Sequence, residues 1–200
     1  MPDAALRTSP LLEDARDFVQ TLAGWRQSNR GRLAQLKRNV GEPFPGRGVA
    51  WFYSVLYAGN SKRRLFYADQ HFLIATLFDL NRFAPDFGAA NSRNLGASMR
   101  LAVERGANPD STGRRLQILL DADFEEGAAS ELAFRLRQCV QWLAGQNIGL
   151  DYAQLLLDLC NWAPSQEFID RFGDRSVQKR WARSFYNVRL FQSAETNVTP

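Results

Sequence analysis

Apolar residues recur every three or four positions along most of the chain, which is the spacing of one face of an α-helix. No segment shows the strict apolar–polar alternation of a half-buried strand. Turn residues separate the periodic segments from one another. The pattern predicts helices over 12–26, 29–40, 47–58, 62–82 and 94–105, and four more that contain 116–120, 132–143, 152–159 and 177–188.

The segment 62–82 is predicted as one long helix whose middle, 71–78, is apolar on every side. A helix of this kind lies inside a protein, so we expect it to form the centre of the first half. Short loops between amphipathic helices are typical of bundles. We therefore predict an all-α protein made of two small helical bundles, or lobes, with an irregular linker between Phe83 and Gly113. The N-terminal lobe is placed at 1–90 and the C-terminal lobe at 91–200.

Short polar residues mark the beginnings of the helices in the second half. Ser130 and Asp151 are expected to be N-caps, because their side chains can accept hydrogen bonds from the first turn of a helix. Ser111 or Thr112 is expected to cap the helix before them.

Composition is that of an ordinary globular protein, with 45% hydrophobic and 23% charged residues. No run approaches the roughly 18 apolar residues of a membrane span, and the N-terminus lacks the pattern of a signal peptide. We therefore expect a cytoplasmic location and no membrane partner. Cys139 and Cys160 lie in apolar helical patterns and are expected to be buried free thiols.

The sequence offers no catalytic constellation. His71 is the only histidine, and because it opens an apolar run we interpret it as a core residue rather than a general base. No nucleophile elbow, phosphate-binding glycine loop or dinucleotide fingerprint is present. We expect no enzymatic activity, metal, cofactor or small-molecule substrate. The densest acidic group fits no calcium loop and is interpreted as a solvated helix end; it contains Asp121, Asp123, Glu125 and Glu126.

The net charge of +4 is unevenly distributed along the chain. Between Arg26 and Arg64 there are nine basic residues and a single acid, Glu42. A concentrated positive field attracts polyanions. On charge alone, a nucleic-acid surface and an ordinary solvated surface both remain open.

Several basic clusters lie on the outer faces of predicted helices. Leu33, Leu36 and Val40 share one face of the second helix, which places its cations outward. Lys62, Arg63 and Arg64 begin a predicted helix, where cations oppose the helix dipole, and this placement favours a functional role. The other candidate cations, taken along the chain, are Arg30, Lys37, Arg38, Arg100, Arg114, Arg115, Arg135, Arg137, Lys179, Arg180 and Arg183.

Arginine suits phosphate because its planar fork can donate two parallel hydrogen bonds. None of the clusters contains a module that reads bases. Any bound nucleic acid is therefore expected to be held by its backbone, with little sequence preference. Most aromatic residues, including Trp51, Phe52 and Trp181, are interpreted as core.

Six segments in order resemble the CasB family, the small subunit of the type I-E CRISPR Cascade complex. The basic segment 30–38 resembles the family's second helix, and 72–78 resembles its buried helix. The remaining segments are similar to its later helices. They are 94–100, 114–122, 136–138 with 150–162, and 177–186, so that the resemblance covers about 30–187.

The resemblance implies an all-helical, two-lobed protein without enzymatic activity. It implies two copies in the complex, contacts with other Cascade subunits and the guide RNA, and a basic face for the displaced non-target single-stranded DNA. By position, the basic surface of the family corresponds to Lys37, Arg38, Arg100, Arg114, Arg115 and Arg137. The acidic turn 123–126 and the segment 165–174 depart from the family pattern, and the turn could redirect the strand locally.

Two alternatives remain open. The chain could be a structural adaptor whose basic face meets acidic protein, or an enzyme such as a nuclease.

Overall fold

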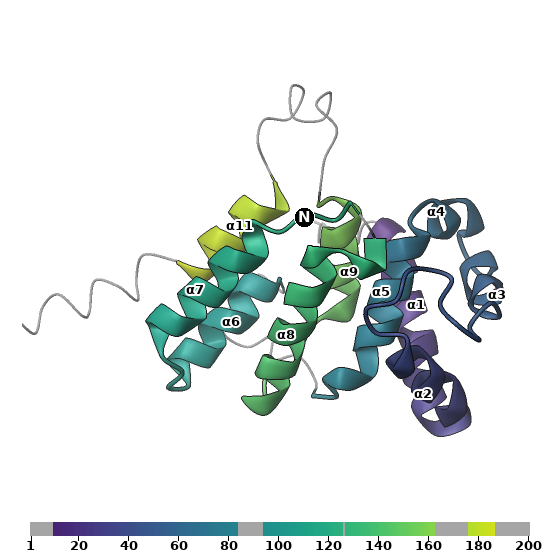
Figure 1. Ribbon diagram of the computed structural model, residues 1–200, viewed down its shortest axis with the longest axis horizontal. Helices are drawn as coiled ribbons and strands as arrows, with labels where there is room; N and C mark the ends of the chain where they lie inside the picture. The colour runs from purple at the N-terminus through teal and green to yellow at the C-terminus, as the bar shows by residue number, and fades with distance from the viewer. Residues whose placement is uncertain (1–9, 84–93, 126, 163–175, 187–200) are drawn as a thin grey trace, which may run out of the picture.

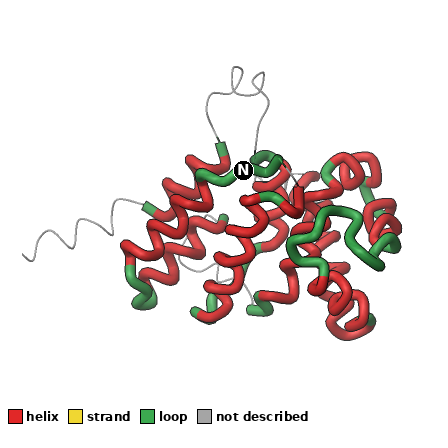
Figure 2. Tube along the Cα trace, in the orientation of Figure 1, coloured by secondary structure: helices red, strands yellow, loops and turns green. Residues whose placement is uncertain are grey.

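The computed structural model describes residues 10–83, 94–125, 127–162 and 176–186. All regular structure within these ranges is helical, which confirms the predicted all-α class (Figure 2). The helices of the first part are α1 (Pro10–Ser28), α2 (Arg30–Arg38), α3 (Phe52–Tyr57), α4 (Ser61–Phe66), α5 (Ala68–Leu77) and the 3₁₀ turn η1 (Phe78–Leu80). Those of the second part are α6 (Leu95–Glu104), α7 (Pro109–Leu120), the 3₁₀ turn η2 (Gly127–Ala129), α8 (Glu131–Gly145), α9 (Tyr152–Cys160) and α11 (Val177–Phe185).

The helices are arranged in an elongated row (Figure 1). Helices α6, α7 and α11 lie at one end, α2, α3 and α4 lie at the other, and α8 and α9 lie between them. Helix α9 packs against α1 and α5, so the second half of the chain contributes a helix to the packing of the first. The division into lobes at 1–90 and 91–200 stays a prediction.

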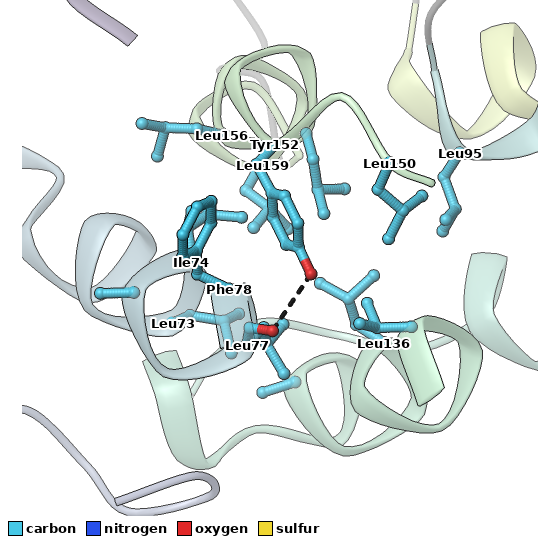
Figure 3. Packing of buried hydrophobic residues seen from close by; sticks show 14 of the residues in the cluster. Leu73, Ile74, Leu77, Phe78, Leu95, Leu136, Leu150, Tyr152, Leu156 and Leu159 are labelled. Carbon is cyan, nitrogen blue, oxygen red and sulfur yellow. Dashed lines mark hydrogen bonds between the residues drawn. The ribbon is translucent and has the colours of Figure 1, made fainter. Parts of the chain in front are cut away.

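Helix α5 is the buried centre of the first half, as its sequence predicted. Every residue from His71 to Leu77 is buried. Side chains from α9 and α8 cover it, and the Tyr152 hydroxyl donates a hydrogen bond to the Leu77 carbonyl at 3.1 Å (Figure 3). The buried apolar residues form one cluster that runs from Ala15 in α1 to Phe185 in α11.

Two predicted helices are shorter than expected. The segment 62–82 is broken, because Tyr67 leaves the helical region (φ −106°, ψ 39°) and separates α4 from α5. After α5 the chain continues as the 3₁₀ turn η1 rather than as α-helix. In the segment 47–58, Gly48 adopts a positive φ of 71°, and helix begins only at Phe52. The Asn39 side chain donates to the carbonyls of Gln35 and Arg47 and ties this loop to α2.

The N-caps of the second half are partly as predicted. Ser130 accepts from the Ala133 amide at 3.2 Å and Asp151 from the Gln154 amide at 3.0 Å, which confirms both caps. The prediction of Ser111 or Thr112 was wrong, because Asn108 caps α7 and Pro109 occupies its first turn. Proline is favoured there, since its missing N–H would have no helical partner.

Gly96 allows α6 and α11 to approach each other closely. A Cβ atom at this position would lie 2.9 Å from the Trp181 Cα and closer still to the Trp181 carbonyl. Backbone cannot move aside as the end of a flexible side chain can. A side chain at position 96 would therefore force the two helices apart.

We predict that Gly96→Ala lowers the free energy of unfolding by about 1–3 kcal/mol through overpacking. Urea unfolding of the purified chain measures this change. Gly24→Ala is the matched control, because Gly24 lies inside α1 with no atom within 4 Å of its would-be Cβ. It is expected to gain roughly 0.5–1 kcal/mol from reduced backbone entropy of the unfolded chain. Equal effects of the two substitutions would contradict the close approach.

His71 is a core residue, as its sequence context predicted, but only one of its ring nitrogens is hydrogen-bonded. Nδ1 lies 2.7 Å from the Tyr67 carbonyl, an acceptor, so Nδ1 carries the proton. Nε2 is buried without a hydrogen-bond partner. The ring packs edge-on to Phe18 at 4.9 Å. Burial, with a smaller effect from the Arg64 guanidinium, lowers the pKa of His71 to about 4 against the opposing hydrogen bond to Tyr67.

The lowered pKa of His71 predicts a loss of stability in acid. Between pH 6.5 and pH 4 the unfolded chain binds a proton on this ring and the folded chain does not. The free energy of unfolding therefore falls as the pH falls through this window, by up to about 3 kcal/mol from this group. Urea unfolding at several pH values measures the slope. The slope of His71→Leu should be smaller, and identical slopes would contradict the assignment.

Candidate nucleic-acid interface

Helix α2 displays its cations outward because its apolar residues face the core. Asn29 caps the helix by accepting from the Arg32 amide at 3.3 Å, and Leu33 and Leu36 are buried. The three candidate cations on this helix, Arg30, Lys37 and Arg38, are all exposed, as predicted.

A groove of about 550 Å³ runs along one side of α2, where the end of α1 and η1 meet it. Its lining, which we call the basic groove, is Arg26, Arg30, Leu33, Ala34, Lys37, Asp79 and Arg82. Arg26 and Arg82 were not among the sequence-predicted site residues. Arg26 lies near the end of α1, directly before α2 in sequence, whereas Arg82 follows η1 and is far from α2 along the chain. Helical periodicity therefore gave no sign that the two arginines share a groove.

The other side of α2 has a second depression, of about 360 Å³. Arg38 shares it with Arg47 and a single acid, Glu42. Arg32 lies elsewhere, over the adjacent rings of Trp25 and Trp51, at 5.3 and 4.7 Å from their centroids. Stacking of this kind fixes the guanidinium against the protein.

Arg114, Arg115 and Arg135 come together in a hollow of about 230 Å³ between α7 and α8, as part of a lining that we call the basic hollow. Arg115 lies over the Trp142 ring at 5.3 Å, and Arg135 pairs with Glu131 at 3.0 Å. The other lining residues are Ser111, Ile118, Gln138 and Cys139. Burial raises the pKa of Cys139 to about 12, which keeps its thiol protonated.

Arg137 is on α8 but does not line the basic hollow. It is half-buried, and its Nε atom is buried without a hydrogen-bond partner. Two residues along a helix correspond to a rotation of about 200°, which takes Arg137 away from Arg135.

Arg100 and Arg180, both predicted site residues, make contacts that link helices within the protein. Arg100 of α6 donates to the Ser184 carbonyl at 3.0 Å and lies 3.3 Å from Glu104. Arg180 of α11 pairs with Asp158 of α9 at 2.9 Å. Each of them links helices, and a role of either in nucleic-acid binding stays a prediction.

Asp158 is a buried carboxylate that joins α9 to α11. It accepts hydrogen bonds from Arg180, from the Trp181 indole at 2.6 Å and from Gln154 at 3.0 Å. Burial raises the pKa of Asp158, and these donors act in the opposite direction.

The remaining candidates, Lys179 and Arg183, lie on the exposed side of α11, opposite the buried Val177, Trp181 and Phe185. Helix α11 is at the other end of the molecule from α2 (Figure 1). The predicted residues are therefore spread over separate surfaces of the protein.

Comparison with known proteins identifies the family. Residues 32–186 match the family model of CRISPR-associated protein Cse2. The chain belongs to the Cse2 family, also called CasB. A crystal structure of M. ruber CasB is 26% identical, covers 90% of this chain and 98% of its own length, and superimposes with a TM-score of 0.63. A CRISPR RNA-guided surveillance complex contains a chain that is 21% identical, with 94% and 99% coverage and a TM-score of 0.63, which shows a shared fold. No curated protein matched the sequence.

The position of Arg64 in this Cse2-family chain corrects the prediction of a functional role for the cations at 62–64. The charge at the start of α4 was interpreted as functional, but the Arg64 side chain is 1% exposed and pairs with Asp14 at 2.8 Å and Asp17 at 2.9 Å. The buried guanidinium also donates to the Val55 carbonyl at 3.4 Å. Because the helix ends at Phe66, Arg64 lies in the last turn of the short α4, where a cation does not oppose the helix dipole. Its burial depends instead on the two carboxylates from α1.

The described part of this Cse2-family chain contains no group of three or more potential metal ligands. Asp121, the first residue of the acidic group, directly follows α7 and accepts from Gln117 in the last turn of that helix. No helix in the described ranges is long and apolar enough to cross a membrane.

Arg64 and Arg38 should respond differently to truncation. Arg64→Ala is expected to lower the free energy of unfolding by about 3 kcal/mol or more, because it leaves Asp14 largely buried without its partner. Arg38→Ala is expected to change it by less than about 0.5 kcal/mol, because the side chain is exposed. Thermal or urea unfolding of both variants measures the difference. A similar loss in both would contradict the division into structural and exposed cations.

Proposed function

We propose that this chain is the small, non-catalytic subunit of a type I-E CRISPR Cascade complex, and that it stabilises the R-loop by holding the displaced DNA strand. Family membership supports the place in the complex. The observation that carries the binding role is the set of exposed cations on α2 and α7, chiefly Lys37, Arg38 and Arg114, which make no ion pair with any described residue.

The proposed ligand is the phosphate backbone of the strand. Exposed guanidinium groups can each neutralise a phosphate and release counterions, so several weak contacts add up to useful affinity. Replacement of a DNA duplex by an RNA–DNA hybrid is nearly balanced in free energy. Modest contacts to the freed strand are therefore enough to favour the open state.

The same proposal includes the protein partners of the chain. Within the complex, two copies would contact the subunits that hold the guide RNA, in the cytoplasm of the host. The chain itself would add no chemistry, so a purified sample with magnesium should not cleave DNA or RNA.

A structural adaptor is the second candidate, and one observation favours it. Ile118 and Phe134 are large apolar side chains that are 42% and 52% exposed, beside Arg114 and Arg135. Exposed apolar residues surrounded by charge are a feature of protein–protein interfaces. In this case the basic hollow would contact an acidic protein surface.

We predict that replacement of Arg38, Arg114, Arg115 and Arg137 with Ala weakens binding of the isolated chain to single-stranded DNA by about tenfold or more at low salt. The slope of log affinity against log salt should become shallower by about 0.7 for each phosphate that the variant no longer neutralises. Fluorescence anisotropy with an oligothymidylate measures both quantities. The control is Arg16→Ala with Lys62→Ala, two exposed cations outside the grooves, whose effect per charge should be smaller.

Reconstitution of the complex with the same fourfold variant separates the two candidates. Normal assembly with reduced opening of target DNA supports strand binding. Failure of assembly supports the adaptor. Unchanged DNA affinity and unchanged opening would remove these four residues from the proposal.

A further inference from the structure

The basic groove holds two arginines and one carboxylate that contacts both. Asp79 accepts from Arg82 Nε at 2.7 Å and also from its NH2 group, and Asp79 Oδ1 lies 3.7 Å from Arg26 Nε. The Asp79 side chain is 11% exposed, whereas that of Arg82 is 67% exposed. A single, mostly buried carboxylate therefore holds two guanidinium groups at the groove.

Arg26 is held in place but is incompletely hydrogen-bonded. Its guanidinium lies over the Phe78 ring at 4.4 Å, and NH2 donates to the Phe78 carbonyl at the long distance of 3.3 Å. Its Nε atom is buried and has no hydrogen-bond partner. Buried donors are seldom left in this state, and leaving one unpaired costs free energy. The side chain is thus fixed at the groove, where a ligand can reach its terminal nitrogens but not the buried Nε.

The chemistry of the groove fits a phosphodiester. Four cations and one acid line it, because Arg30 and Lys37 face the same space as Arg26 and Arg82. A phosphodiester presents two charged oxygens, which is the arrangement that a guanidinium binds with parallel hydrogen bonds. Leu33 and Ala34 add an apolar wall, against which a sugar can pack.

We infer that the basic groove is a binding site for a nucleic-acid phosphodiester, with Arg26 and Arg82 as its phosphate ligands and Asp79 as an internal competitor. In the free chain Asp79 holds both arginines at the groove. A phosphate that binds in the groove draws the two guanidinium groups away from Asp79. The carboxylate then loses part of its interactions, and this cost limits the affinity for the phosphate. This inference rests on the proposed function and adds a site to it.

Asp79→Asn tests the competition directly. The amide keeps the shape of the side chain but removes the charge that opposes a phosphate. We expect an oligothymidylate of about 20 nucleotides, enough to fill one site, to bind about threefold to tenfold more tightly. The salt slope should steepen by up to about 1, because more counterions are released. Fluorescence anisotropy of the full chain measures both.

Glu13→Gln is the matched control, because it makes the same change in net charge at an exposed position on α1 outside the groove. The gain in affinity from Asp79→Asn must exceed the gain from Glu13→Gln. This difference must disappear when Arg26→Gln and Arg82→Gln are added. An excess that survives these two substitutions would place the effect elsewhere and overturn the site. If the Asp79 variant does not fold, Arg82→Gln alone decides: it should weaken binding about twofold or more, and no change overturns the site.

Two further outcomes would assign the groove to another class of ligand. Tighter binding of polyglutamate but not of the oligonucleotide would assign the groove to an acidic protein segment. Displacement of the oligonucleotide by inorganic phosphate, beyond that by chloride at equal ionic strength, would assign it to a free anion. Either result overturns the inference. Absence of oligonucleotide binding by the wild-type chain would overturn the proposed function as well, whereas binding that Asp79→Asn does not improve beyond Glu13→Gln overturns this site alone.

Discussion

The burial of α5 from His71 to Leu77 is the constraint on which the rest of the structure depends. A segment without a polar face must be covered on all sides, and α2, α3, α8, α9 and η2 pack around it. Each covering helix turns its apolar residues inward and thereby turns its charged residues outward. The outward display of Lys37 and Arg38 on α2 follows from the inward positions of Leu33 and Leu36. The candidate binding surface is thus a consequence of core packing.

A second constraint is that every buried guanidinium needs acceptors. Arg64 obtains them from Asp14 and Asp17. The buried carboxylate of Asp158 has the matching need for donors, which Arg180 and Trp181 supply. These side chains join helices that are distant in sequence. The exposed cations need no acceptor from the protein, since water solvates them when no anion is bound. Arg26 lies between the buried and the exposed cations. Its side chain is held by contacts within the protein, but its buried Nε has no acceptor.

Periodicity predicted the elements that depend on local sequence and missed those that depend on the folded chain. The fold class, the burial of α5, the caps Ser130 and Asp151 and the outer face of α2 could all be predicted. The break at Tyr67 could not, because no proline or glycine lies between positions 61 and 70 to mark the end of a helix. The pairing of Arg64 with carboxylates about fifty positions earlier was equally hidden, as was the meeting of Arg26, Asp79 and Arg82. Membership of the Cse2 family was visible because it depends on the order of short motifs.

The spacing of the basic surfaces bears on the kind of ligand that the chain can hold. The basic groove on α2 and the basic hollow on α7 and α8 lie toward opposite ends of an elongated molecule (Figure 1). A compact ligand could occupy one of them but could not bridge them. An extended polyanion can reach both the groove and the hollow. Because it is flexible, it can form weak contacts one after another along the protein. Under the proposed function, the displaced strand would therefore gain affinity from the length of the protein rather than from one tight site. The carboxylate of Asp79 would keep the contact in the basic groove weak enough to be reversible.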